Sequence, residues 1–461
     1  MAPPDKFGKG VLLCTALIVV FQAFVPPIVG LADNADYLPA TSRLYLDINN
    51  PGPWDPERFF RYLVVNYHHT DKPPTMENPW TSEVLLLLPA RLLNTLLSKD
   101  GLFDLRWTGV THGLLFLTAI GLMLPLIAAF SPMGRLVTAF FAVLVLTDVS
   151  YVSYFNSFYP DAASFVMLLL LTAAGARFFS GQDPTRRGLF LMTVCAWLFV
   201  TSKVQHVILT PPLLLFVFWK RRAIAAAGGR LAAPLLAALL TISSVVMLTT
   251  MPQRYRGIAL YNVVFFHILP NDSNPVGVLE ELNLPRDWVR YKGTHAYSQG
   301  SGAFDPEFQR LWYRQAGFGR LLLYYARHPR VPFGLLKEGF NHSTIYRPGF
   351  ANFQKSSGYA QYAESQAFAL WSGWKRAAFY PGLWGNWLYW LIPAGVLLWR
   401  LSPGLRRAEG LLLLMAVIEF LASSLTDVGD MARHLFLFNV LIDLNFLAAV
   451  AAVSHSIGRR A

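Results

Sequence analysis

The sequence predicts an all-α membrane protein with about ten transmembrane helices, and three observations support this fold class. Hydrophobic residues make up 54% of the chain and charged residues only 14%. The mean hydropathy is +0.38. Apolar runs recur along the chain, and with their flanks most of them reach the roughly 17–25 residues that cross a bilayer as a helix.

The apolar runs predict one integrated membrane domain with three parts. Residues 1–251 form an N-terminal bundle of about seven spans, with a long outer loop at 32–107. Residues 252–382 form a larger outer loop, and residues 383–461 form a C-terminal segment of three spans. The predicted spans are residues 11–31, 108–130, 136–147, 162–176, 189–201, 207–218, 231–251, 383–398, 411–425 and 435–453.

The basic residues predict the orientation of these spans. With the N-terminus inside, the inner segments hold 15 basic residues and three acids. Positive charge is retained on the cytoplasmic side, so both termini are expected in the cytoplasm and both long loops on the outer face of the inner (plasma) membrane. This bias accounts for most of the net charge of +12, which is therefore no sign of a nucleic-acid partner. The second outer loop holds 15 basic and eight acidic residues, an excess that indicates an anionic partner.

Both long outer loops are expected to carry structure of their own, because long structureless loops are uncommon in compact domains. In the first loop, residues 56–67 have apolar side chains at helical intervals. Residues 85–97 are apolar but are interrupted by Pro89 and Arg91. Both segments predict helices that lie in the membrane interface. The second loop is predicted to form a small, partly helical cap, with one helix over 308–326.

Two carboxylates follow the first span directly. Asp33 and Asp36 are three residues apart, so they would share a face if the helix continued. Carboxylates this close to hydrocarbon are costly and usually functional. The pair is therefore predicted to be catalytic, with one acid as a base and the other as an orienter or second base, and Asp33 is the first candidate for the base. The alternative is a helix end whose acids are solvated among the lipid headgroups.

A second candidate group lies at the next outer turn. Asp148 ends the third span and Asp161 opens the fourth, and the turn between them is rich in hydroxyl and aromatic side chains, including Asn156 and Tyr159. Aromatic faces and polar groups suit a sugar, so these four residues are predicted to bind substrate. The alternatives are a belt of interfacial tyrosines and a helix-capping role for Asp161.

Three basic residues are predicted to hold the phosphate of a donor. Lys203 lies between two outer helix ends, and Arg433 and His434 follow Asp427 and Asp430 before the last span. Arginine binds phosphate through two parallel N–H bonds, and Asp430 is expected to lie near the substrate. The alternatives are a snorkelling lysine and an internal ion pair of Arg433 with one of the two aspartates.

The carboxylate motif after the first helix, the interfacial segments and Arg433 before the last helix together resemble the GT-C superfamily of integral-membrane glycosyltransferases. The sequence is most similar to bacterial surface-glycan hexosyltransferases of the WsfD type. This resemblance covers the architecture over most of the chain, through short motifs. It implies that a sugar passes from a polyprenyl-phosphate-linked donor to a glycan, lipid or protein acceptor at the outer membrane face, in cell-surface glycan or glycolipid assembly. Many relatives carry Asp-Glu or Glu-x-x-Tyr where this chain has Asp-x-x-Asp, so the choice between Asp33 and Asp36 as base stays open.

The sequence leaves a metal and two other functions open. Asp33, Asp36 and Asp161 offer oxygen ligands for Mg²⁺ or Mn²⁺, but no ligand spacing requires a metal, and no other cofactor is indicated. An outer-face glycan ligase or polymerase with a polyprenyl-diphosphate donor would use His342 and Arg347. A lipid or solute transporter would place its polar site near the bilayer midplane, often between repeated halves, whereas no repeat is visible here.

Overall fold

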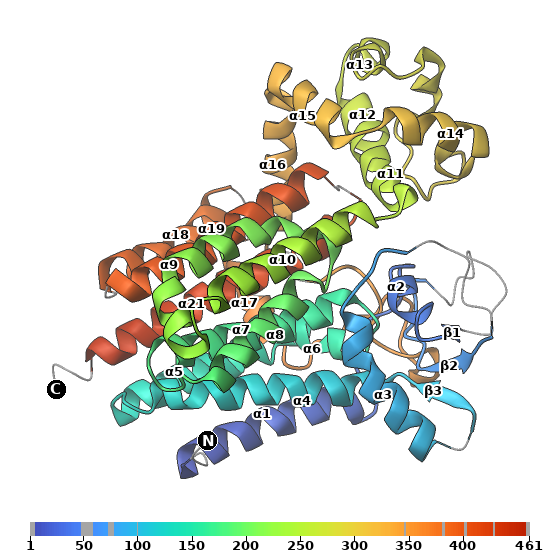
Figure 1. Cartoon of the computed structure of the whole chain (residues 1–461). Helices are drawn as coiled ribbons and strands as arrows, with labels where there is room; N and C mark the ends of the chain where they lie inside the picture. Colours follow the sequence, from blue (N-terminus) through green and yellow to red (C-terminus); the bar gives the residue numbers. More distant parts are fainter. Residues whose placement is uncertain are drawn as a thin grey trace.

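The computed structural model of the chain describes residues 5–47, 59–71, 78–98, 100–344, 347–379, 383–400, 403–426 and 429–457. Most of these residues are helical, as predicted. Figure 1 shows a bundle of long helices in which α1 begins and α21 ends on the same side. The small sheet and the cap formed by α11 to α16 lie at the opposite end of the bundle.

A helix occupies each of the ten positions where the sequence predicts a span. Among the described residues, six helices are long and apolar enough to cross a membrane. A bent pair, α5 with the segment Val149–Phe155, would be a seventh. The count of ten spans therefore stays a prediction. The ten helices are α1 (Lys6–Phe24), α4 (Arg106–Met123), α5 (Pro132–Leu146), α7 (Pro160–Phe179), α8 (Arg186–Val200), α9 (Thr210–Gly228), α10 (Ala232–Thr249), α18 (Leu383–Arg400), α19 (Pro403–Thr426) and α21 (Phe436–Ile457).

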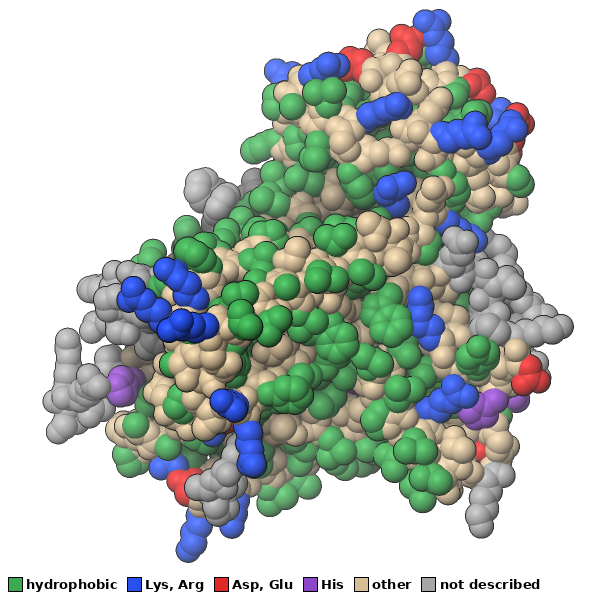
Figure 2. All heavy atoms as spheres, viewed as in Figure 1, with side chains coloured by type: hydrophobic (Ala, Val, Ile, Leu, Met, Phe, Trp, Pro, Cys, Tyr) green, Lys and Arg blue, Asp and Glu red, His purple; other side chains and the backbone are tan. Residues whose placement is uncertain are grey.

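Helix α7 lies at the centre of the bundle, and its apolar residues are buried nearly all round. A helix that is hydrophobic on every side is expected in such a position. By contrast, the face of the bundle seen in Figure 2 carries many hydrophobic side chains, while Lys and Arg lie mostly at the ends of the bundle and on the cap. This distribution is what a lipid-facing lateral surface requires.

The first span ends earlier than predicted. Helix α1 stops at Phe24 because Pro26 and Pro27, which lack a backbone N–H, follow at once. The expectation of a helix through residue 31 is therefore wrong. Residues 28–32 are nevertheless buried, because this non-helical segment runs inside the outer end of the bundle.

The first outer loop contains a small antiparallel sheet that the sequence did not predict. Strands β1 (Leu46–Asp47), β2 (Asn66–His69) and β3 (Leu102–Asp104) lie in that order, with Tyr67 opposite Phe103. The predicted helix over 56–67 is wrong within the described part, since residues 59–65 are irregular and β2 begins at Asn66. The helix predicted over 85–97 is confirmed as α3 (Glu83–Leu97).

The second outer loop forms a largely helical cap. Its single predicted helix over 308–326 is wrong, because the chain breaks at Ala316 and Gly317 between α14 and α15. The elements are α11 (Gln253–Tyr261), the π-helix η4 (Asn262–Ile268), α12 (Leu269–Asn271), α13 (Pro275–Glu281), η5 (Arg286–Tyr291), η6 (Gly302–Phe304), α14 (Pro306–Gln315), α15 (Phe318–Arg327), α16 (Arg330–His342), η7 (Lys355–Ser357) and α17 (Leu370–Phe379).

A strap, residues 350–353, joins the two outer loops. Its backbone accepts N–H bonds from Gly30 (3.1 Å), Ala32 (2.9 Å) and Leu63 (2.8 Å). The side-chain amide of Asn352 also donates to the Gly30 carbonyl, at 2.7 Å. The segment that leads from the first helix to Asp33 is thus held from both sides by parts of the chain distant in sequence.

Candidate functional site

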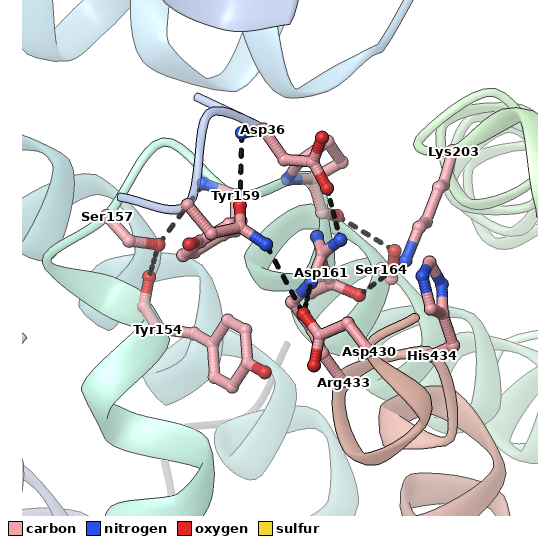
Figure 3. Close-up of polar contacts among 12 residues, drawn as sticks. Asp36, Tyr154, Ser157, Tyr159, Asp161, Ser164, Lys203, Asp430, Arg433 and His434 are labelled. Atoms are coloured by element: carbon pink, nitrogen blue, oxygen red, sulfur yellow. Dashed lines mark hydrogen bonds and ion pairs between the residues drawn. The ribbon is translucent and has the colours of Figure 1, made fainter. Parts of the chain in front are cut away.

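Arg433 lies at the centre of a cluster of three aspartates (Figure 3). It belongs to α20 (Met431–His434), a single helical turn before α21, and is only 3% exposed. Its guanidinium forms ion pairs with Asp36, with Asp430 at 2.8 Å and with Asp161 at 3.7 Å. Segments that are far apart in the sequence therefore meet at one cation.

The charges around Arg433 hold it in the protonated form. Burial alone would lower the pKa of the guanidinium, but the surrounding carboxylates, chiefly Asp36, Asp430 and Asp161, raise the pKa well above its usual range. Tyr159 lies with its ring 5.2 Å from the guanidinium carbon, which adds a cation–π contact. Its hydroxyl donates to the Ala32 carbonyl at 2.8 Å, so the same ring also holds the backbone next to Asp33.

A second cation shares one of these carboxylates. Lys203 donates to Asp161 at 3.1 Å, and both side chains are buried. Asp161 therefore lies between Lys203 and Arg433. This arrangement leaves the two cations close together at the start of α7.

A narrow pocket opens onto both cations. Its lining includes the side chains of Asp36, Lys203 and Arg433, and its walls are completed by Pro39, Pro79, Trp80, Thr81, Pro160, Ser202, Val204 and Tyr255. Its volume is about 20 Å³, which is room for one water molecule.

The wall of the pocket is tied to the bundle by buried polar contacts. The Thr81 hydroxyl donates to the Ser202 carbonyl at 2.6 Å, and the Ser82 N–H donates to the Thr201 carbonyl at 2.9 Å. One residue further, Glu83 pairs with His112 at 2.9 Å, and both side chains are fully buried. The start of α3 is thereby fixed against the turn that carries Lys203.

The profile of the family described as "YfdI N-terminal transmembrane domain" matches residues 9–460. The chain belongs to this family. The match covers the helical bundle, both outer loops and all the residues of the Arg433 cluster. No curated protein matches the chain.

In this YfdI-family chain the two acids of the Asp-x-x-Asp motif differ in their surroundings. Residues 33–37 form a turn, so the expectation that Asp33 and Asp36 share a helix face is wrong. The Asp33 carboxylate accepts the N–H groups of Ala35 (2.7 Å) and Tyr37 (3.2 Å), and thus shapes the turn. The Asp36 carboxylate instead reaches Arg433 and is 32% exposed.

The structure brings Asp36, Asp161, Tyr159, Lys203, Asp430 and Arg433 together (Figure 3), whereas the side chains of Asp148 and Asn156 form hydrogen bonds to other segments. Asp148 caps α6 (Val149–Val152) and also accepts the Ser372 N–H at 2.9 Å. The Asn156 amide donates to the carbonyls of Ala23 and Val29, both at 2.8 Å, and so bridges the break after α1. Their predicted substrate contacts find no support in this geometry.

The remaining predicted residues of the site are placed as follows. His434 follows Arg433 in α20, and its backbone carbonyl accepts the Ser423 hydroxyl at 2.8 Å. Its side chain is not part of the pocket lining. Asp427 lies outside the described residues. Two further acids, which were not predicted to belong to the site, form hydrogen bonds inside the bundle: Glu419 accepts a bond from Gln205, and Asp443 accepts one from Lys375 at 2.6 Å.

Sequence reasoning missed four residues of this YfdI-family site. Asn34 donates to Asp430 at 3.3 Å, and Trp80, Thr81 and Tyr255 line the pocket. Asn34 lies inside the motif already singled out, so its amide was a usable signal. The other three come from distant segments whose approach to the site depends on the fold.

The carboxylates do not form a metal site as they are arranged here. Within the described ranges, no three His, Cys, Asp or Glu side chains are grouped so that they could hold a metal ion. The guanidinium of Arg433 takes the place among Asp36, Asp161 and Asp430 that a cation would need.

Proposed function

We propose that this protein transfers a sugar from a polyprenyl-phosphate-linked donor to an acceptor hydroxyl at the outer face of the inner membrane. The observation that carries this proposal is the composition of the pocket. Asp36 is the carboxylate that lines it, and it lies beside Lys203 and Arg433. A base next to two cations is what displacement of a phosphate from a sugar requires.

In the proposed reaction the acceptor oxygen attacks the anomeric carbon while Asp36 takes the proton of its hydroxyl. The bond from the anomeric carbon to the phosphate oxygen breaks at the same step, and the lipid phosphate leaves with the bonding electrons. Arg433 and Lys203 stabilise the negative charge of this leaving group. A single displacement of this kind inverts the anomeric centre.

Asp36 is a better base candidate than Asp33 because of what each carboxylate contacts. Asp33 is occupied by two backbone N–H groups and does not line the pocket. General-base catalysis contributes about 10²–10⁴-fold to a rate. We therefore expect Asp36→Asn to lower kcat by at least about 10²-fold. Asp33→Asn keeps an amide oxygen for the two N–H groups, so most of the activity is expected to remain.

The test uses protein reconstituted in lipid nanodiscs with a radiolabelled polyprenyl-phosphate hexose and membrane glycan extracts as acceptors. Asp100→Asn is the matched control, because Asp100 is an exposed aspartate of the same outer loop. Normal turnover by Asp36→Asn together with loss of turnover by Asp33→Asn would move the base to Asp33. Absence of any sugar transfer by the wild-type protein across polyprenyl-phosphate donors would reject the proposal.

The alternative ligase chemistry receives no support from the positions of its residues. His342 bonds the Glu338 carbonyl at 2.9 Å within α16, and Arg347 lies 3.7 Å from Glu364. Neither residue is part of the pocket lining. Parallel assays with a polyprenyl-diphosphate donor, and with lipid translocation as the readout, distinguish the ligase and the transporter from the proposed transferase.

A further inference from the structure

Four ring side chains form a continuous row on the cap, which we name the aromatic stripe: Phe266, His295, Tyr297 and Phe304. The ring centroids are 5.6 Å apart from Phe266 to His295, and 5.7 Å apart at each of the two following steps. The guanidinium carbon of Arg254 lies 5.0 Å from the Phe304 ring and ends the row.

The aromatic stripe is not part of the cap's hydrophobic core. Phe266, Tyr297 and Phe304 are 43%, 39% and 40% exposed. The core is formed by other rings of the cap, among them Trp288 and Trp312, which are buried and pack against Phe308. Three neighbouring exposed rings that lie outside this core indicate a binding surface.

The stripe lies next to the Arg433 cluster at His295, its second ring. An added Cβ on Gly429 would lie 2.4 Å from the His295 ring nitrogen Nε2, so this ring lies directly against the residue before Asp430. Arg254, at the end of the row, is followed in α11 by Tyr255, which lines the pocket with Lys203 and Arg433. The approach of His295 to Gly429 places the stripe beside the cluster that holds the proposed reaction centre.

We propose that the aromatic stripe binds an extended carbohydrate chain, the part of the acceptor beyond the hydroxyl that receives the sugar. Aromatic faces pack against the C–H faces of sugar rings, and Tyr297 and His295 add polar groups at the same surface. Rings in a row suit successive sugars of a chain, and Arg254 favours an anionic one. This inference rests on the proposed function, because it specifies the acceptor of that reaction.

A lipid surface fits the stripe less well than a carbohydrate does. An interfacial helix buries a face of aliphatic and aromatic side chains together in the lipid, and α3 has such aliphatic side chains in its exposed Leu88, Leu92 and Leu96. The stripe instead carries no aliphatic residue and is flanked by the exposed Ser298 and Gln299. Polar neighbours of this kind suit a hydroxyl-rich partner in water.

The experiment compares two acceptors made from the surface polysaccharide of the host: single repeating units, and chains of about ten units or more. We expect wild-type protein to have a lower KM for the chains. Tyr297→Ala and Phe304→Ala should each raise the KM for the chains about tenfold, with little change in kcat or in transfer to single units. Phe333→Ala, another exposed ring of the cap outside the stripe, is the matched control and should behave as wild type.

A second readout needs no sugar transfer. Saturation-transfer NMR with the same chains and no donor should detect binding to the wild type and to Phe333→Ala, and reduced binding to the stripe variants. Equal KM values for units and chains, or stripe variants that match Phe333→Ala, would overturn this inference and leave the transferase proposal intact. Loss of transfer from every donor, with chain binding retained, would reject the transferase alone. A fluorophore at Ser298→Cys that is quenched by lipid-attached quenchers would place the stripe in the bilayer and also overturn it.

Discussion

Arg433 has to satisfy three carboxylates and, in the proposed reaction, a phosphate as well. Replacing it with alanine removes the only partner that Asp36 and Asp430 share within the described cluster, whereas Asp161 keeps Lys203 at 3.1 Å. Breaking a fully buried ion pair costs about 3–5 kcal/mol. Because Asp36 and Asp430 are partly exposed and can be rehydrated, we expect Arg433→Ala to lower the free energy of unfolding by an amount at the lower end of this range, about 3 kcal/mol.

The effect on catalysis is expected to be separate from the effect on stability. Removing one charge-stabilising group from a reaction centre typically lowers kcat about 10²–10³-fold, so Arg433→Ala should be nearly inactive even where it is folded. Arg433→Lys keeps the charge but loses the planar fork that reaches Asp36 and Asp430 together. The loss of one charged hydrogen bond, about 1.5–3 kcal/mol, predicts partial activity and weaker donor binding.

The assay measures thermal unfolding and initial transfer rates in nanodiscs for Arg433→Ala, Arg433→Lys and the double variant Arg433→Ala/Asp430→Asn. The double variant removes one of the carboxylates that the loss of Arg433 leaves unpaired, so it should recover stability but not turnover. Recovery of turnover in the double variant would show that Arg433 only neutralises Asp430, and the phosphate role would be refuted.

Three further predictions follow from contacts elsewhere. Gly429→Ala places a Cβ 2.4 Å from His295 and 2.8 Å from Asn262. Overpacking of this kind lowers stability by about 1–3 kcal/mol, and the resulting shift of Asp430 should lower turnover. Gly349→Ala, with open space around it, should change neither stability nor turnover. Asp443→Asn leaves Lys375 charged inside the bundle and should lower the free energy of unfolding by about 3–5 kcal/mol. Unfolding measurements on the double variant Lys375→Met/Asp443→Leu should show that this stability is recovered. The hydrogen bond from His267 lowers the pKa of Glu338 below its ordinary 4.5. The stability that this bond adds to the cap is therefore present above pH 4.5 and is lost as the pH falls through the lowered pKa of Glu338. Limited proteolysis of the cap against pH should show this loss in the wild type and not in Glu338→Gln.

The helices could be predicted from the sequence because their signal is local. A run of apolar residues long enough to cross a bilayer defines a span without knowledge of its neighbours, and α3 was found despite Pro89. Local patterns also misled, since the apolar spacing at 56–67 suggested a helix where the backbone pairs with the strap and continues into β2. Pairings such as Tyr67 with Phe103 are set by the fold, and no local pattern shows them.

The candidate site was predictable in its residue types more than in its geometry. Asp36, Asp161, Lys203 and Arg433 were all identified because charge beside an apolar span is costly. The choice between the two acids of the motif could not be made, because it depends on Ala35, whose φ of 86° turns the chain between them. Asp36 and Arg433 are also 397 residues apart, so only the folded chain shows that they meet.

The strap at 350–353 has a consequence for the biosynthesis of the protein. The backbone before Asp33 is made early, yet its hydrogen-bonding partners at Ala351 and Asn352 leave the ribosome only after three-quarters of the chain, and Arg433 later still. The first helices must therefore wait in the membrane with their outer turn incomplete. A chain that stops short of Arg433 can insert most of its helices and still lack the cation that joins Asp36, Asp161 and Asp430, so this cluster is completed only when nearly the whole polypeptide has been made.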